Sequence, residues 1–276
     1  MTLPNFLVLG TAKAGTSTLA SYLARHPEVC FARIHEPNFF AFDVQFEKGH
    51  EFYRSLFTHR TTETRFGEKS WRYACHNVYP LAFTRIRAML PELLLIYVLR
   101  DPLKRGISMW RELRDAGQDI VDADPEMALL TDPLISDSMR YASTYRRWAD
   151  AYGTENVKIV FFEDLVNDPR TFYRSVTDFL GIRPFELEAE IHENPSVGLR
   201  SDTAALEWLR RKGFDQSLRR ALPEGIRAFG RKHLKTPIRE VLLSDATRRA
   251  YLSMVRPEAE EALRLAGRPV DFWTLR

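Results

Sequence analysis

The chain has little cysteine and no long apolar run. Its 276 residues include only Cys30 and Cys75, too few for a disulfide framework or a four-cysteine zinc site. The longest apolar run, residues 93–99, has the length of a strand, whereas a bilayer span needs about 20 apolar residues. Residues 6–9 are too short, and lack the basic leader, for a signal peptide. These absences predict a cytoplasmic protein with reduced thiols and no membrane span.

Net charge is also low, and lysine is scarce. The formal net charge is +3, which does not favour nucleic acid as a partner, and only 8 of the 40 basic residues are Lys. Residues 200–239 carry 11 Lys or Arg against 4 Asp or Glu. This basic segment fits a solvated surface or an anion-binding region, and the sequence leaves both open.

Short apolar runs alternate with helical patterns along the chain. We expect strands at residues 6–9, 29–31, 65–68, 93–99 and 157–162, and helices at 16–25, 78–89, 102–115, 138–152, 168–180 and 245–265. This alternation predicts an α/β fold, a parallel sheet flanked by helices. We expect one domain over residues 1–276, with an α/β core over 1–183 and a mainly helical, basic part over 184–276.

A glycine-rich loop follows the first expected strand. Gly10 and Gly15 have the spacing of a phosphate loop between a strand and a helix, where free N–H groups and the positive helix end meet an anion. A nucleotide kinase has Lys directly after the second glycine, but Thr16 stands there and Lys13 precedes Gly15. The loop therefore predicts a phosphate site that differs from the kinase type.

Residues 10–27, GTAKAGTSTLASYLARHP, resemble the 5′-phosphosulfate loop of sulfotransferases that use 3′-phosphoadenosine 5′-phosphosulfate (PAPS). The resemblance implies that Lys13 reaches the bridging oxygen between sulfuryl and phosphate. It implies that the 5′-phosphate is bound by the residues that follow: Ala14, Gly15, Thr16, Ser17 and Thr18. It also implies a P-loop-type sheet, with the donor site in the α/β core.

Residues 97–110 resemble the segment of the same family that binds the 3′-phosphate. Arg100 follows a strand, and Pro102 suits the first turn of the next helix. Arg100 and Ser108 offer a charged fork and a hydroxyl to one phosphate. Taken alone, Arg100-Asp101-Pro102 is more typical of a helix cap and a salt bridge than of a phosphate site.

Residues 66–73, FGEKSWRY, resemble the Glu-Lys-Ser/Thr segment of heparan-type sulfotransferases, which include the N-deacetylase/N-sulfotransferases and the 3-O-sulfotransferases. The resemblance implies that Glu68 is the general base and that Lys69 lies beside the transferring group. The alternative is a surface Glu–Lys pair at a strand end. Cytosolic small-molecule sulfotransferases use a histidine, so His35 and His76 are further candidates. No histidine pair has metal-ligand spacing, and we expect no metal.

The C-terminal basic part is expected to close over the 3′-phosphate. Arg200 is the candidate, with segments 211–213 and 230–232 as rivals. The aromatic residues Trp71, Tyr73, Trp110 and those of segment 39–42 fit either an acceptor cleft or the core.

These patterns predict a soluble bacterial sulfotransferase. The resemblance implies that the donor is PAPS and the product 3′-phosphoadenosine 5′-phosphate (PAP). We expect the acceptor to be a hydroxyl, with an amine as second choice, on a carbohydrate, lipid, natural product or peptide. The alternatives are a P-loop nucleotide kinase or ATPase, and a non-catalytic polyanion-binding protein.

Overall fold

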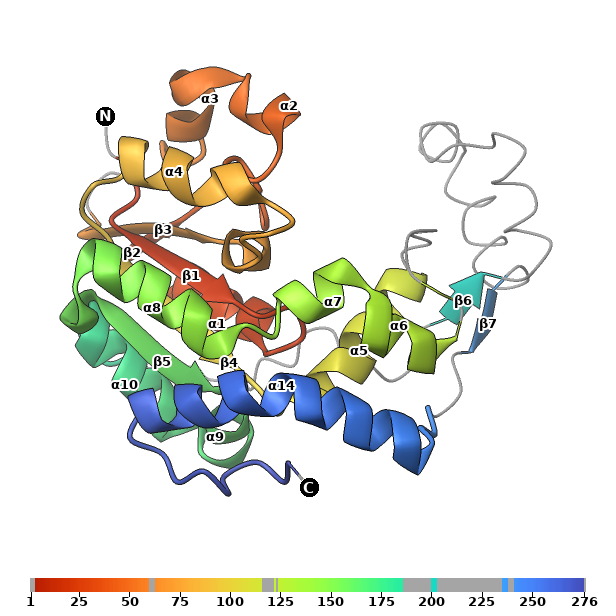
Figure 1. Ribbon diagram of the computed structural model, residues 1–276. Helices are drawn as coiled ribbons and strands as arrows, with labels where there is room; N and C mark the ends of the chain where they lie inside the picture. Colours follow the sequence, from red (N-terminus) through yellow and green to blue (C-terminus); the bar gives the residue numbers. More distant parts are fainter. Residues whose placement is uncertain are drawn as a thin grey trace.

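The computed structural model describes residues 3–59, 63–115, 122, 124–185, 200–202, 235–237 and 241–275. Its centre is a five-stranded sheet in the order β2-β3-β1-β4-β5, with every neighbouring pair parallel (Figure 1). The strands are β1 (Phe6–Gly10), β2 (Val29–Phe31), β3 (Arg65–Lys69), β4 (Leu94–Leu99) and β5 (Val157–Phe161). The five strands predicted from apolar runs are confirmed, each to within one residue at either end.

Helices cover both faces of the sheet (Figure 1). One face packs against α4 (Pro80–Met89), α8 (Tyr141–Tyr152) and α14 (Asp245–Leu265). The other face packs against α1 (Thr16–Arg25), α9 (Phe162–Asn167) and α10 (Pro169–Leu180). The predicted α/β fold is therefore confirmed. Asp168 caps α10 by accepting a hydrogen bond from the Thr171 N–H, and Pro169 occupies the first helical position, as expected.

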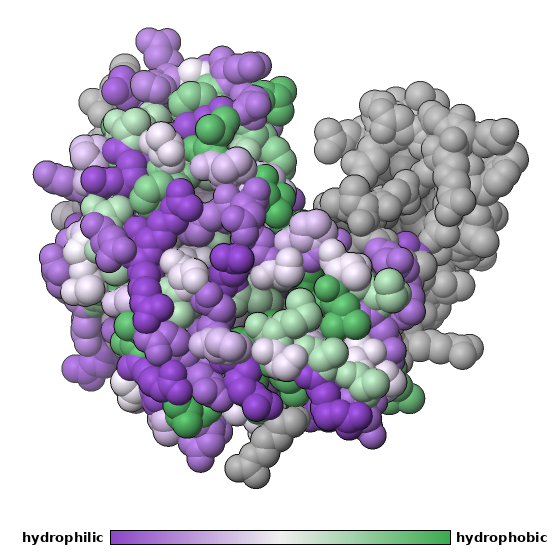
Figure 2. All heavy atoms as spheres, viewed as in Figure 1, coloured by the Kyte–Doolittle hydropathy of each residue, from purple (hydrophilic) through white to green (hydrophobic). Residues whose placement is uncertain are grey.

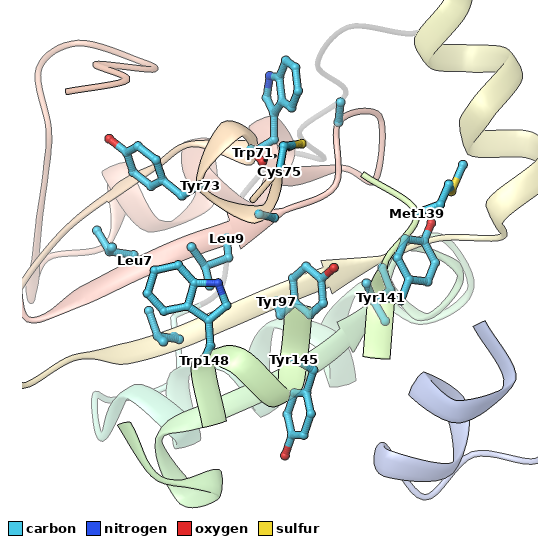
Figure 3. Close-up of a cluster of buried hydrophobic side chains, with 14 of the residues drawn as sticks. Leu7, Leu9, Trp71, Tyr73, Cys75, Tyr97, Met139, Tyr141, Tyr145 and Trp148 are labelled. Atoms are coloured by element: carbon cyan, nitrogen blue, oxygen red, sulfur yellow. Dashed lines mark hydrogen bonds between the residues drawn. The ribbon is translucent and has the colours of Figure 1, made fainter. Parts of the chain in front are cut away.

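Successive side chains of a strand point to opposite faces of the sheet. Leu7 and Leu9 of β1 belong to the core on the α8 side, where Figure 3 shows them beside Trp148 and Tyr97, whereas Val8 belongs to the core on the α1 side. In the neighbouring strand, Glu68 is in register with Leu7 and Lys69 with Val8. Glu68 and Lys69 therefore leave the sheet on opposite faces.

Several short elements were not predicted. They are α2 (Asp43–Phe46), α3 (Gly49–Ser55), α6 (Pro125–Thr131), α7 (Pro133–Asp137), α9 and the 3-10 helices η1 (Trp71–Ala74) and η2 (Thr154–Asn156). The starts of α6 and α7 do carry a sequence signal, because Asp124 and Asp132 cap them directly before a proline. The expected helix at 138–152 begins at Tyr141, since the preceding residues form the turn that ends α7.

The predicted helix at 102–115 is α5 (Pro102–Asp115), and β6 (Arg200–Asp202) lies against it. β6 pairs antiparallel with β7 (Lys235–Pro237). Of the part expected to be helical, α14 is confirmed, and residues 186–199, 203–234 and 238–240 lie outside the described ranges. Among the described helices, none has both the length and the apolar character that a membrane crossing requires. Figure 2 shows hydrophilic side chains over α8 and a gathering of hydrophobic ones over α6 and α7.

Candidate active site

The predicted site segments meet at one edge of the sheet. β1 lies between β3 and β4, and all three strands are parallel, so their carboxyl ends point the same way. The glycine-rich loop follows β1, Glu68 and Lys69 end β3, and Arg100 follows β4. Ligand sites of open α/β sheets form at this edge.

The loop between β1 and α1 has an unusual backbone conformation that leaves the N-terminus of α1 uncapped. Gly15 has φ +82, and a Cβ there would lie 2.8 Å from Cδ2 of Phe162, so the position requires glycine. Lys13 also has positive φ, at 68°. No described side chain caps α1, and its first N–H groups are therefore available to a ligand.

Two arginines fix the loop through its carbonyl groups. Arg100 donates from Nη1 to the Lys13 carbonyl at 2.8 Å and stacks on the Phe162 ring. Arg105 of α5 is fully buried and donates to the Ala12 carbonyl at 3.4 Å and to Ser138 Oγ at 2.8 Å. No described carboxylate forms an ion pair with Arg105. The arginines thus place two positive charges behind the loop, and burial lowers the pKa of Arg100.

Arg105 was not among the predicted site residues. Met109 follows it by four positions, and the Met109 sulfur accepts a hydrogen bond from Nη1 of Arg105 at 3.4 Å, so both lie on the buried face of α5. The position of Arg105 on the apolar side of that helix was the sequence signal that could have indicated its burial.

Lys13 forms an ion pair with a residue of α5, whereas Ser108 is buried on that helix. Nζ of Lys13 lies 2.8 Å from Oε2 of Glu112, which is half-exposed on α5. Ser108 is buried, two turns into the same helix. Apart from Arg200, the predicted phosphate-binding residues therefore lie in the loop between β1 and α1, in the first turn of α1, directly after β4 and on α5.

Glu68 is fully buried and is held through one of its oxygens. The hydroxyls of Tyr53 and Tyr73 donate to Oε1 at 2.8 and 2.9 Å, while Oε2 has no hydrogen-bond partner among the described residues. Burial raises the pKa of Glu68 to about 8, and Glu36 adds to the rise, although the two tyrosine hydrogen bonds lower it. The surface Glu–Lys alternative is wrong, since both side chains are buried.

Lys69 connects this segment to the loop. Its Nζ donates to Ser17 Oγ at 2.8 Å and to Glu36 Oε1 at 2.9 Å. Arg72 approaches the other oxygen of Glu36 at 3.6 Å. Glu36 and Tyr53, which contact Lys69 and Glu68, were not among the predicted site residues.

The remaining candidates are the two histidines and the aromatic residues. His35 is exposed on the segment after β2. His76 is half-buried and packs against Phe83 and Trp148, and this burial lowers its pKa to about 4. Of the aromatic candidates, Phe39, Phe40, Trp71, Tyr73 and Trp110 are all buried, as the core interpretation expected.

Arg200 begins β6, whose backbone lies beside α5. Both rival segments, 211–213 and 230–232, lie outside the described residues. Within the described ranges, no three His, Cys, Asp or Glu side chains group in a way that could hold a metal ion.

Comparison with known proteins gives consistent matches. A model of the sulfotransferase family matches residues 39–186, more than half of the chain, which includes Glu68, Arg100 and Ser108. Heparan sulfate glucosamine 3-O-sulfotransferase 3A1 of Mus musculus is 32% identical over 208 residues, covering 71% of this chain and 50% of that protein. Bifunctional heparan sulfate N-deacetylase/N-sulfotransferase 2 of Homo sapiens is 28% identical, covering 98% of this chain and 31% of that protein. The chain thus spans half or less of these relatives.

Among solved structures, a sulfotransferase from Alicyclobacillus acidocaldarius superposes with a TM-score of 0.70 at 20% identity. The superposition covers 99% of this chain and 100% of that one. The two proteins therefore share their fold.

Proposed function

Since the chain belongs to the sulfotransferase family, we propose that it transfers the sulfuryl group of PAPS to a hydroxyl group of an acceptor, with PAP as the second product. An amine is the second choice of acceptor. The acceptor classes that we propose are carbohydrate, lipid, natural product and peptide.

One observation carries this proposal, the hydrogen bond from Lys69 Nζ to Ser17 Oγ. It joins the residue next to Glu68 to the first turn of α1, 52 positions earlier in the chain. A phosphate loop and a buried carboxylate are thereby held at one sheet edge. Sulfuryl transfer requires that combination, an anion site beside a proton acceptor.

The chemistry divides among the residues as follows. The acceptor oxygen forms a bond to sulfur while the bond from sulfur to the phosphate oxygen breaks, and the electron pair of that bond stays on the phosphate. Glu68 takes the acceptor proton. Lys13 stabilises the charge that develops on the leaving phosphate oxygen, and Lys69 lies beside the transferring group.

The remaining residues bind the donor. Residues 14–18 hold the 5′-phosphate through N–H groups and hydroxyls, Arg100 and Ser108 hold the 3′-phosphate, and Arg200 contributes from β6. Arg100 suits its role because it is anchored to the loop by one Nη atom and keeps other donors for a phosphate.

Calorimetry with PAP tests the donor site. We expect the wild-type chain to bind PAP and Arg100→Ala to bind it roughly 10- to 100-fold more weakly, the range for a lost charge-assisted hydrogen bond. Arg249→Ala removes an exposed arginine of α14 and serves as the matched control. Absent PAP binding, or equal binding by Arg100→Ala, would refute the donor site.

Radiolabelled PAPS, offered with sugar, phenol, lipid and peptide hydroxyls, tests the reaction itself and identifies an acceptor. With that acceptor, Glu68→Gln should slow transfer by about 10²–10⁴-fold and leave PAP binding unchanged. Transfer by Glu68→Gln at the wild-type rate would remove Glu68 as the base. Magnesium-dependent ATP turnover would favour the kinase alternative.

A further inference from the structure

The two oxygens of the Glu68 carboxylate have different surroundings. Oε1 accepts both tyrosine hydroxyls, at 2.8 and 2.9 Å, and Oε2 is buried without a described hydrogen-bond partner. A buried carboxylate oxygen that lacks a hydrogen-bond partner is energetically unfavourable, more so than a buried neutral group. Such an arrangement calls for a functional explanation.

The tyrosines come from separate elements on either side of β3. Tyr53 lies on α3 and Tyr73 lies in η1, and both are fully buried. Their rings are fixed by the aromatic pair Phe39 and Phe40: Tyr53 stacks on Phe39 with ring centres 4.5 Å apart, and Phe40 contacts Tyr53 edge-on at 5.0 Å and Tyr73 at 5.7 Å. Because a hydroxyl moves only with its ring, both donors have fixed positions.

Three of the segments around Glu68 contribute a titratable group. α3 supplies Tyr53, η1 supplies Tyr73, and the segment after β2 supplies Glu36, whose charge is partly balanced by Lys69 and Arg72. Glu36 and burial both disfavour the ionised form of Glu68. The two tyrosine hydroxyls favour the ionised form.

From this geometry we propose that Tyr53 and Tyr73 are positioning residues, which lock Oε1 of Glu68 and thereby make Oε2 the atom that accepts the proton of the acceptor. The proposal rests on the proposed function, in which Glu68 is the base. It assigns the tyrosines a role in the reaction that neither packing nor the fold requires, because phenylalanine would fill the same space.

The first test measures the pKa of Glu68 without any acceptor. The full chain, labelled with 13C at the glutamate carboxyl carbon, is titrated by NMR, and Glu68→Gln identifies the signal by its loss. Tyr53→Phe and Tyr73→Phe should each raise the pKa of Glu68 by about one pH unit, since each removes a hydrogen bond to the ionised form. Tyr145→Phe, a buried tyrosine on α8, is the matched control and should leave that pKa unchanged.

The second test follows the rate, with water as the acceptor, so that PAPS gives sulfate and PAP. The acidic limb of the pH profile should move upward in each variant by the same amount as the pKa of Glu68. The double variant should also lose about tenfold or more at the plateau, while its PAP affinity stays at the wild-type value. A packing role would lower the rate by one factor at every pH.

Melting temperatures verify that each variant is folded. If folded Tyr53→Phe and Tyr73→Phe leave both the Glu68 pKa and the acidic limb in place, the positioning role is refuted. If Glu68→Gln hydrolyses PAPS at the wild-type rate, the base assignment fails instead. The two failures are therefore distinguishable.

Discussion

The phosphate loop and the Glu68 pocket follow adjacent strands, β1 and β3, yet they hold charge by different means. At the loop, Arg100 and Arg105 donate hydrogen bonds to neutral carbonyl groups of the loop. At the pocket, a carboxylate is enclosed by two hydroxyls and by burial that raises its pKa to about 8. We therefore expect the loop to bind an anion, whereas burial in the pocket favours the protonated form of Glu68.

The largest expected effect is that of Lys13→Ala, which tests whether the loop supplies positive charge to the reaction. If the loop supplies charge to the leaving phosphate, this change should slow sulfuryl transfer by about 10²–10³-fold and weaken PAP binding far less. Steady-state rates and calorimetry separate the two effects. Lys104→Ala removes an exposed lysine of α5 and should change neither. A variant of Lys13 that loses only PAP affinity would contradict the role.

The stability of Glu68→Gln tests the other half of the comparison, the burial of Glu68 as an acid. The folded pKa of Glu68 lies above the usual value of 4.5, so protonation favours the folded state and wild-type stability falls as pH rises from about 4.5 to 8. The neutral amide avoids this loss, and its advantage in urea denaturation should widen by up to about 1.4 kcal/mol per pH unit over that range. An advantage that is constant with pH would show that Glu68 is not buried as an acid.

The smallest effect is expected from Glu112→Gln. Lys13 must leave Glu112 to meet a nucleotide, and this partly exposed ion pair is weak. PAP should therefore bind about two- to fivefold more tightly to the variant. Glu260→Gln, which removes an ion-pair partner of Arg264 on α14, is the control. Weaker PAP binding by Glu112→Gln would mean that Glu112 itself assists the nucleotide.

The sequence predicted the loop better than the pocket, for a physical reason. A strand, a glycine turn and a helix start are contiguous, and so are β4, Arg100 and Pro102, so their patterns appear in one window. The pocket is assembled from Glu36, Tyr53 and Glu68, which come from three segments. One of these is the seven-residue helix α3, which is too short to show a periodic pattern. Arg105 was not predicted for a different reason, since sequence patterns rarely reveal that an arginine is buried.

Residues Glu68 and Lys69 are neighbours in the chain but leave β3 on opposite faces, one toward the tyrosines and one toward α1. Their positions therefore depend on the register of β3. Inserting or deleting a single residue in β3 would place the side chain of each on the opposite face of the sheet. Exchanges of residue type in this strand keep its register, whereas a change of its length does not. A change of its length would put an acid against the donor and a cation among the aromatic rings, even if the sheet itself survived.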